Sequence, residues 1–267
     1  MAGTLCQKLG QLLALSANPQ AEPGKPYLLE NDGMLSLQFD ALCLQSEMNI
    51  EDPNQLVFSY TRAMVSFLLF EPSPKRIAMI GLGGGSLAKY CYRYLPHAEI
   101  AVVEINPDVI ALRNEFAIPA DDARFKVVLG DGAVFVKVSN DLFDVLMVDG
   151  FDTSGLPDAL CSQQFYDDCF ASLTGNGIMV ANLWSSSGLH GALASRIETS
   201  FAGRMVVVNA DDSPNKIVLA FKNSELSLSP ARIKQYVNEL TQSHPLNFQA
   251  KSKKLIASVA AGAIHPA

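Results

Sequence analysis

The chain has 267 residues, a length typical of one large α/β domain with a small appendage. Hydrophobic residues make up 49% and charged residues 18%, which excludes collagen-like, low-complexity and globally disordered proteins. The formal net charge of −7 disfavours general nucleic-acid binding, because an acidic surface repels phosphates. No run of 18 apolar residues occurs, so we expect neither a membrane-spanning helix nor a membrane partner.

Five cysteines are scattered along the chain without the close pairs that structural zinc or thioredoxin-like chemistry requires. Four histidines likewise lack metal-ligand spacing. We therefore expect free, mostly buried thiols and no metal site. The N-terminus makes a poor signal peptide, and we expect a cytoplasmic location.

The first 70 residues predict a small β-rich domain with a linking helix. The expected elements are strands over residues 27–30, 34–39 and 42–48 and a helix over residues 55–70. The turn triplet Asn31-Asp-Gly33 favours a β-hairpin between the first two strands. Edge strands of this hairpin are candidates for pairing between two subunits of a homodimer. The breaker over residues 71–74 marks the start of a second domain, residues 71–267.

After the breaker, strands and helices alternate, which is typical of a parallel sheet covered on both faces. We expect strands at residues 76–80, 100–104, 125–129, 145–149 and 177–183 and helices near residues 87–94, 107–116, 133–138, 162–173 and 189–201. Strands at residues 205–209 and 216–221 must be antiparallel, because their link is too short for a crossover. This layout predicts a class I S-adenosylmethionine-dependent methyltransferase-like Rossmann fold. A last helix should end near Gln242, before a solvated tail from Lys251.

Four glycines, Gly81, Gly83, Gly84 and Gly85, form a turn between an apolar strand and a helix. Glycines let the backbone turn sharply and approach a ligand, and the helix start offers unpaired N–H groups. We therefore predict a nucleoside or nucleotide on this turn, rather than a merely tight connection. Ser86 occupies the last position of the G-x-G-x-x-G fingerprint, which disfavours a nicotinamide-dependent oxidoreductase.

Acidic side chains follow the second and third strands of the larger domain. Glu104 ends the second strand, where a carboxylate can accept hydrogen bonds from ribose hydroxyls or cap the helix that starts at Asn106. Asp131 and Gly132 follow the third strand at the same edge. Asp131 is a candidate for the adenine amino group and for the next helix N-cap, two roles that can coexist.

Two further carboxylates, Asp149 and Asp152, follow the fourth strand. Ligands of open α/β sheets bind at this edge, and a carboxylate buried beside another can have a raised pKa suited to accepting a proton. The alternative is turn chemistry around Gly150. We predict that Asp149 and Asp152 are catalytic.

The order of these parts resembles the spermidine synthase-like aminopropyltransferases, from the N-terminal hairpin to about Phe221. The shared parts are Tyr60, Gly81–Gly85, Glu104, Gly130–Gly132, Asp149, Asp152, Gly155–Pro157, Phe165 and Tyr166. The resemblance implies decarboxylated S-adenosylmethionine as a co-substrate on the glycine turn, with Glu104 on its ribose and Asp131 on its adenine. It also implies that the Asp149–Asp152 pair binds and deprotonates a polyamine and that Tyr60 completes the site.

Two positions depart from that family's pattern. Gly84 stands where the family has an aspartate that contacts the donor's aminopropyl amine, and Arg62 stands where it has a glutamate. A cation at position 62 would repel a polyamine. The expected function is aminopropyl transfer from decarboxylated S-adenosylmethionine to a polyamine or another amine, with Asp149 as the base. The alternatives are an S-adenosylmethionine-dependent methyltransferase, which Gly84 favours, and a non-catalytic protein that binds an adenosyl ligand or polyamine.

Overall fold

The computed structural model describes residues 25–40, 43–139, 142–151, 155–184, 190–223 and 230–260. The strands are β1 (Tyr27–Asn31), β2 (Met34–Asp40), β3 (Cys43–Asn49), β4 (Arg76–Ile80), β5 (Glu99–Glu104), β6 (Phe125–Leu129), β7 (Phe143–Val148), β8 (Leu173–Trp184), β9 (Met205–Asn209) and β10 (Asn215–Phe221). The helices are α2 (Ser59–Met64), α3 (Ser86–Tyr94), α4 (Pro107–Ala111), α5 (Gly132–Val138), α6 (Gln163–Ala171), α7 (His190–Ser200), α8 (Pro230–Ser243) and α9 (Phe248–Ala260), with 3-10 helices η1 (Val65–Leu69) and η2 (Asp158–Leu160). No helix in these ranges is long and apolar enough to cross a membrane.

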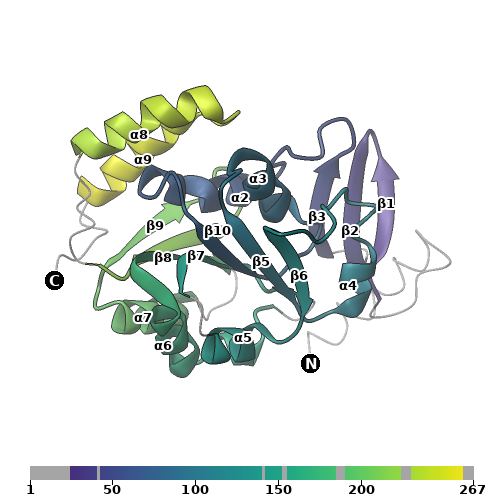
Figure 1. Ribbon diagram of the computed structural model, residues 1–267, viewed down its shortest axis with the longest axis horizontal. Coiled ribbons are helices and arrows are strands. Elements are labelled where there is room, and N and C mark those ends of the chain that lie inside the picture. Colours follow the sequence, from purple (N-terminus) through teal and green to yellow (C-terminus); the bar gives the residue numbers. More distant parts are fainter. Residues whose placement is uncertain are drawn as a thin grey trace.

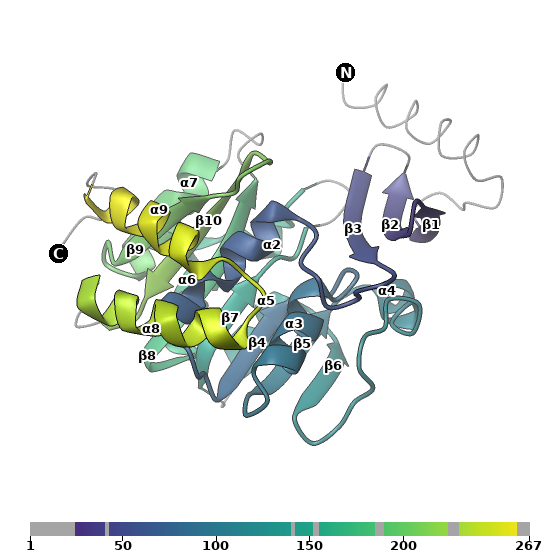
Figure 2. The ribbon, with the colours of Figure 1, turned by 90° about the horizontal axis from the view of Figure 1, so that it is seen from above.

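A small antiparallel sheet has the strand order β1-β2-β3 and stands to one side of the larger sheet (Figure 2). Asp32 and Gly33 both have positive φ, 49° and 74°, as a two-residue hairpin turn requires. The expected hairpin and third strand are confirmed. The domain boundary near residue 70 stays a prediction.

The larger sheet has the order β6-β5-β4-β7-β8-β10-β9 (Figure 1). Neighbouring strands from β6 to β8 are parallel, and β10 is antiparallel to both β8 and β9. The expected layout, a parallel sheet that ends in an antiparallel hairpin, and the methyltransferase-like fold predicted from it are therefore confirmed. The fourth parallel strand ends at Val148, one residue earlier than expected, so Asp149 is the first residue beyond it.

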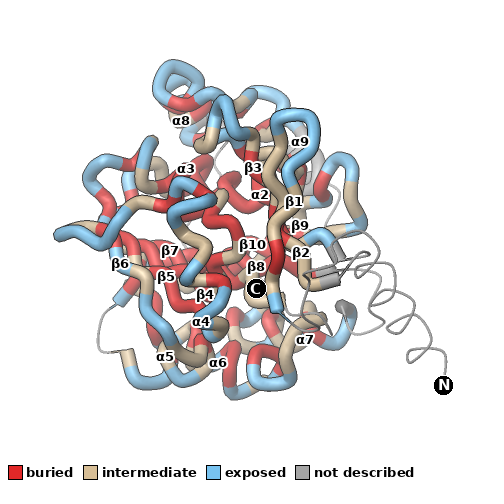
Figure 3. Tube along the Cα trace, turned by 90° about the vertical axis from the view of Figure 1, so that its right-hand side faces the viewer, coloured by how far each residue is buried: buried red, intermediate tan, exposed pale blue. Residues whose placement is uncertain are grey.

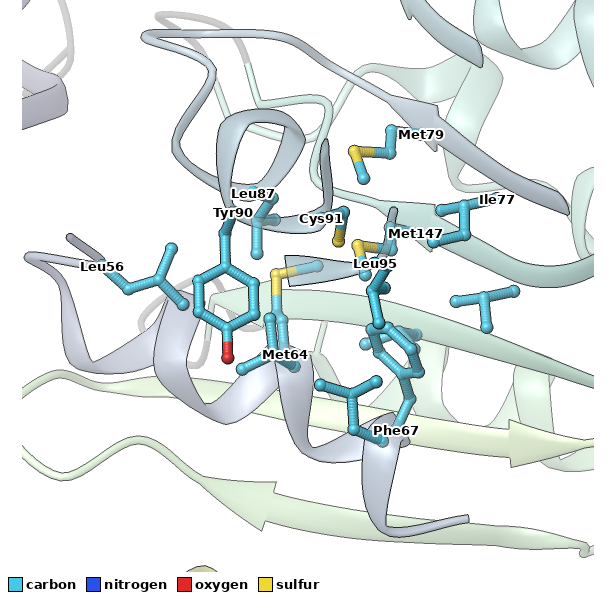
Figure 4. Close-up of a cluster of buried hydrophobic side chains, with 14 of the residues drawn as sticks. Leu56, Met64, Phe67, Ile77, Met79, Leu87, Tyr90, Cys91, Leu95 and Met147 are labelled. Carbon is cyan, nitrogen blue, oxygen red and sulfur yellow. The ribbon is translucent and has the colours of Figure 1, made fainter. Parts of the chain in front are cut away.

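Helices cover both faces of the larger sheet (Figures 1 and 2). Helices α5, α6 and α7 lie on one face, while α2, η1, α3, α8 and α9 lie on the other. The central strands are buried between these layers (Figure 3). Met64 and Phe67 pack with Tyr90 of α3 and with Ile77 and Met147 of the sheet (Figure 4).

The helix expected over residues 55–70 is shorter than expected. It comprises α2 and then η1, while the chain before it is extended at Phe58. The guanidinium of Arg62 donates to the carbonyl of Leu56 over 2.8 Å and to that of Val57. These bonds hold the extended residues that precede α2 beside the helix instead of in line with it.

Residues 251–260 belong to helix α9, so the solvated tail expected from Lys251 is wrong over the described residues. Phe248, Ser252 and Leu255 are 0%, 8% and 1% exposed, a spacing that places them on one face of α9. Helix α9 packs against α8, β9 and η1. The lysines occupy positions between these buried residues.

His244, just beyond α8, is buried between the C-terminal helices and α3. Its Nδ1 and the hydroxyl of Tyr90 are 2.8 Å apart in a hydrogen bond, and its ring lies against Tyr94 and Phe248. Burial lowers the pKa of His244 to about 4. The folded chain therefore holds this imidazole neutral at physiological pH.

Acidification should destabilise the fold through His244. The unfolded chain binds a proton at this imidazole below about pH 6.5, whereas the folded pKa is about 4. The stabilisation is therefore complete above about pH 6.5 and is lost as the pH falls towards 4, by at most about 3 kcal/mol. Urea unfolding at pH 7.5 and 4.5 should show a smaller loss for His244→Gln than for the wild type. His97→Gln, at an exposed position, is the control and should keep the wild-type loss.

Candidate active site

A cavity of about 720 Å³ lies at the carboxyl ends of the parallel strands. Its walls come from the β4–α3 turn, the ends of β5 and β7, the β6–α5 connection, and also from β3 and α2. This volume is within the range of natural ligand pockets. The carboxylates of Glu104, Asp131 and Asp149 line it, and no lysine, arginine or histidine is among its described lining residues. The cavity is therefore suited to cationic ligands.

The glycine turn passes directly over the end of β7. Gly81 has a φ of +95°, and a Cβ at this position would lie 2.3 Å from the backbone oxygen of Asp149. Only glycine meets both constraints. Gly81 and Gly83 line the cavity, while Gly84 and Gly85 are buried behind the turn. The predicted contact of Gly84 and Gly85 with a ligand therefore stays a prediction.

Gly84 lies against the small sheet. A Cβ at Gly84 would meet Ser46 Oγ at 2.6 Å and Phe116 Cδ1 at 2.8 Å. Ser46 comes from β3, is 7% exposed and lines the cavity. The space into which an aspartate would extend from position 84 is therefore filled by Ser46 and Phe116.

Glu104 joins the glycine turn to the β5–α4 connection. It is 8% exposed, its Oε2 accepts from the N–H of Leu82 over 2.8 Å, and its Oε1 accepts from the N–H of Asn106 over 2.9 Å. Asn106, rather than Glu104, caps α4, because its Oδ1 accepts from the N–H of Asp108. Each oxygen of Glu104 keeps a second lone pair, which is available to a ligand in the cavity.

Asp131 starts α5 as its N-cap. Its Oδ1 accepts from the N–H of Ala133 over 2.7 Å. The expected capping role is thereby confirmed. Asp131 and Gly132 both line the cavity, beside the end of β5. Binding of adenine by Asp131 stays a prediction.

Tyr60 and Asp149 meet across the cavity, one from α2 and one from the end of β7. The Tyr60 hydroxyl donates to the Asp149 carboxylate, and Asn182 Nδ2 donates to Asp149 Oδ1 over 2.8 Å. Burial raises the pKa of Asp149, and the bonds from Asn182 and Tyr60 oppose this rise. Burial, followed by the Asp149 charge, raises the pKa of Tyr60 well above its ordinary value, so Tyr60 remains a donor.

Two asparagines at the site were not predicted from the sequence. Asn182 is 3% exposed on β8, and Asn215 Nδ2 donates to Asn182 Oδ1 over 2.9 Å. Both line the cavity. A polar side chain inside the apolar run of residues 178–183 was the available signal for Asn182. Asn215 carried no comparable signal, because it follows the polar residues 211–213 in the sequence.

Other residues named from the sequence are placed differently or lie outside the described part of the chain. Asp152 lies outside the described residues, and so does the side chain of Trp184. Phe165 and Tyr166 are 2% and 1% exposed in the core under α6, and neither lines the cavity. They belong to the same buried cluster as Ile80 and Leu160, which do line the cavity.

Arg62 points away from this cavity. Besides holding the carbonyls of Leu56 and Val57, it lines a separate cavity of about 160 Å³ between α2, β9 and α9. Asp211 and Lys251 line that second cavity too. Arg62 is not among the described residues that line the main cavity, so the expected position of this cation in the polyamine site is wrong.

Residues 57–210 match the family described as the spermine/spermidine synthase domain. The chain belongs to this family. A polyamine aminopropyltransferase of Neisseria meningitidis serogroup A is 37% identical over 86% of this chain and 88% of its own length. That of Chromobacterium violaceum is 36% identical over 88% of each chain. The resemblance recognised from the order of motifs is confirmed.

A solved spermidine synthase in complex with the transition-state analogue AdoDATO has a TM-score of 0.67 and 18% identity to the chain. The match covers 89% of this chain and 87% of that one. Human methyltransferase-like protein 13 in complex with SAH has a TM-score of 0.61 and 23% identity, over 69% of this chain and 91% of that one. These likenesses confirm the fold, which both kinds of transferase share.

A side chain at position 84 should destabilise the protein. Gly84→Ala places a Cβ against Ser46 and Phe116, and such overpacking costs about 1–3 kcal/mol. Gly175→Ala is the matched control, since a Cβ there meets nothing within 4 Å. Thermal unfolding should show a lower melting temperature for Gly84→Ala alone; equal temperatures for both variants would contradict the close packing at Gly84.

Proposed function

We propose that the chain transfers an aminopropyl group from decarboxylated S-adenosylmethionine to a polyamine or a related amine. One observation carries this proposal: the cavity contains three carboxylates and, among its described lining residues, no basic side chain. A sulfonium donor and an ammonium acceptor are both cations, which such a cavity attracts. The carboxylate of intact S-adenosylmethionine would add a further negative charge to the cavity.

The donor would lie along the glycine turn with its adenosyl group towards β5 and β6. Glu104 would accept hydrogen bonds from the ribose hydroxyls through the lone pairs that the backbone leaves unused. Asp131 would accept from the adenine amino group while it caps α5. These contacts would hold the sulfonium near Asp149, which lies beside Gly81.

The acceptor amine is protonated near neutral pH, with a reference pKa of about 10.4 for a lysine-like group, and cannot attack in that form. Asp149 would remove one proton, and the freed lone pair would attack the carbon beside sulfur. The new C–N bond forms as the C–S bond breaks. The electron pair of the C–S bond stays on sulfur, so the sulfonium becomes a neutral thioether. Asp152 would hold a distal ammonium of the acceptor. Tyr60 would orient Asp149, so that alignment supplies much of the rate.

Methyl transfer from intact S-adenosylmethionine is the second candidate, because one observation favours it. Ser46 and Phe116 fill the space beside Gly84 from which the family's aspartate would contact the donor amine. A donor with a different tail would not need that aspartate. The acidity of the cavity favours the decarboxylated donor, and we place aminopropyl transfer first for that reason.

Calorimetry with methylthioadenosine, S-adenosylmethionine, its decarboxylated form and NAD tests the proposal, followed by product analysis with diamines and polyamines. Tighter binding of the decarboxylated donor and formation of a lengthened polyamine are expected. Preference for the intact donor with a methylated product would establish the second candidate. Binding of methylthioadenosine without turnover of any amine would instead support a non-catalytic binding protein.

Asp149→Asn should lose turnover and keep the fold. Loss of a general base lowers the rate by about 10²–10⁴-fold. Because burial raises the pKa of Asp149, the ionised carboxylate lowers stability once the pH exceeds the unfolded pKa. The variant should therefore melt at the wild-type temperature or above it at pH 7.5. The wild-type rate should fall with decreasing pH through a pKa above the ordinary aspartate value. Asp158→Asn, at an exposed position on η2, should keep wild-type turnover.

Glu104→Gln should weaken nucleoside binding. The amide offers one acceptor oxygen where the backbone N–H groups of Leu82 and Asn106 now use two, so the turn and the ribose contact are both disturbed. Calorimetry should show a loss of about 10–100-fold in methylthioadenosine affinity. Glu99→Gln, an exposed position at the opposite end of β5, should leave that affinity unchanged.

The cellular location and the oligomeric state are part of the proposal too. A cytoplasmic location is in keeping with the free, buried thiols of Cys91, Cys161 and Cys169. A homodimer through the edge strands of the small sheet likewise stays a prediction.

A further inference from the structure

A line of hydrogen-bonded side chains leads from Asp149 across the larger sheet. Asn182 Nδ2 donates to Asp149 Oδ1 over 2.8 Å, and Asn215 Nδ2 donates to Asn182 Oδ1 over 2.9 Å. The line thus joins the end of β7 to β8 and to the first residue of β10. Its inner member, Asn182, is 3% exposed.

The strand register brings the two asparagines together. Asn182 is paired with Ile217, and Asn215 is paired with Trp184 in the antiparallel β8–β10 ladder. Residues two apart on a strand share one face of the sheet, so Asn182 and Asn215 are diagonal neighbours on the same face. Helix α2, which carries Tyr60, packs against β8 and β10.

The bond from Asn215 and the carboxylate of Asp149 favour the same orientation of the Asn182 amide. An amide has a donor end and an acceptor end, and its orientation follows from its partners. Because Asn215 donates to Asn182 Oδ1, the NH₂ group of Asn182 is directed at the carboxylate. In the reverse orientation, the Asn182 carbonyl would face the Asp149 carboxylate and repel it.

Among the described residues, few other groups lie where they would set the charge of Asp149. Tyr60 is the titratable side chain bonded to it, and Glu104 and Asp131 line the same cavity from the ends of β5 and β6. Arg62 on α2 lies in the wall of the other cavity. Hydrogen bonds donated to a carboxylate stabilise its ionised form. The asparagine pair therefore favours the proton-accepting state of Asp149.

We propose that Asn182 and Asn215 are positioning residues that together fix Asp149 in the orientation and charge state needed to accept a proton. The catalytic part of this inference rests on the proposed function, in which Asp149 is the base. Asn215 acts only through Asn182, since it is the Asn182 amide that contacts the carboxylate.

The test compares Asn182→Ala, Asn215→Ala and the double variant by two readouts. The first is the pH dependence of kcat/KM for aminopropyl transfer, and the second is the titration of the Asp149 carboxyl carbon by ¹³C NMR without substrate. We expect the acid limb and the NMR titration to move up by about one pH unit in Asn182→Ala and by about half a unit in Asn215→Ala. The double variant should equal Asn182→Ala, because the outer bond acts through the inner one.

Asn223→Ala is the matched control. It removes another asparagine pair, Asn223 Nδ2 to Asn176 Oδ1 at 2.7 Å, at the opposite end of the same strands. Both readouts should stay at the wild-type value. If Asn182→Ala does not fold, Asn215→Ala against Asn223→Ala still decides the question.

Additive shifts in the double variant, or an Asp149 titration unchanged in Asn215→Ala, would overturn the inference. Failure of the proposed function looks different. In that case the wild type transfers no aminopropyl group to any amine, while the NMR titrations still report whether the asparagine pair controls Asp149.

Discussion

The site depends on the close approach of two strand ends. The backbone at Gly81 passes so near the carbonyl oxygen of Asp149 that a single added carbon would lie 2.3 Å from it. Because β4 and β7 are parallel neighbours, the turn after one and the carboxylate after the other begin at the same edge. Glu104 then fixes the other side of the turn through Leu82. The backbone at Gly81 and Leu82 thus positions both the proposed nucleoside contacts and the proposed base.

A buried carboxylate is costly, and the surrounding structure limits that cost without removing it. Burial favours the protonated form of Asp149, while Tyr60 and Asn182 donate hydrogen bonds that favour the ionised form. The balance leaves a carboxyl group whose pKa lies above the ordinary aspartate value. Such a group combines proton affinity with partial desolvation, which suits transfer from an ammonium ion. The same balance lowers stability locally, as is common at functional sites.

The small sheet has a direct part in the site. Its strand β3 brings Ser46 against Gly84, where the family's aspartate would extend. Its residues Leu37 and Met48 belong to the same buried cluster as the larger sheet's Ile77 and Met79. In the proposed site, the wall beside the donor's tail is built by the small sheet as well as by the glycine turn. The proposed choice of donor would therefore depend on how the N-terminal strands pack.

The sequence by itself determined the strands of the larger sheet, the antiparallel direction of its last pair, the hairpins, the glycine turn and the acids at the strand ends, because these follow from local hydrophobic period, turn chemistry and chain connectivity. It could not determine contacts between residues far apart along the chain. Asn182 and Asn215 meet only through the β8–β10 register, and Arg62 is turned from the cavity only by its bonds beside α2. Likewise, α9 is a helix because the core receives Phe248 and Leu255, which local composition rich in lysine concealed. Such directions of side chains are set by packing and long-range hydrogen bonds, and therefore only the tertiary structure decided them.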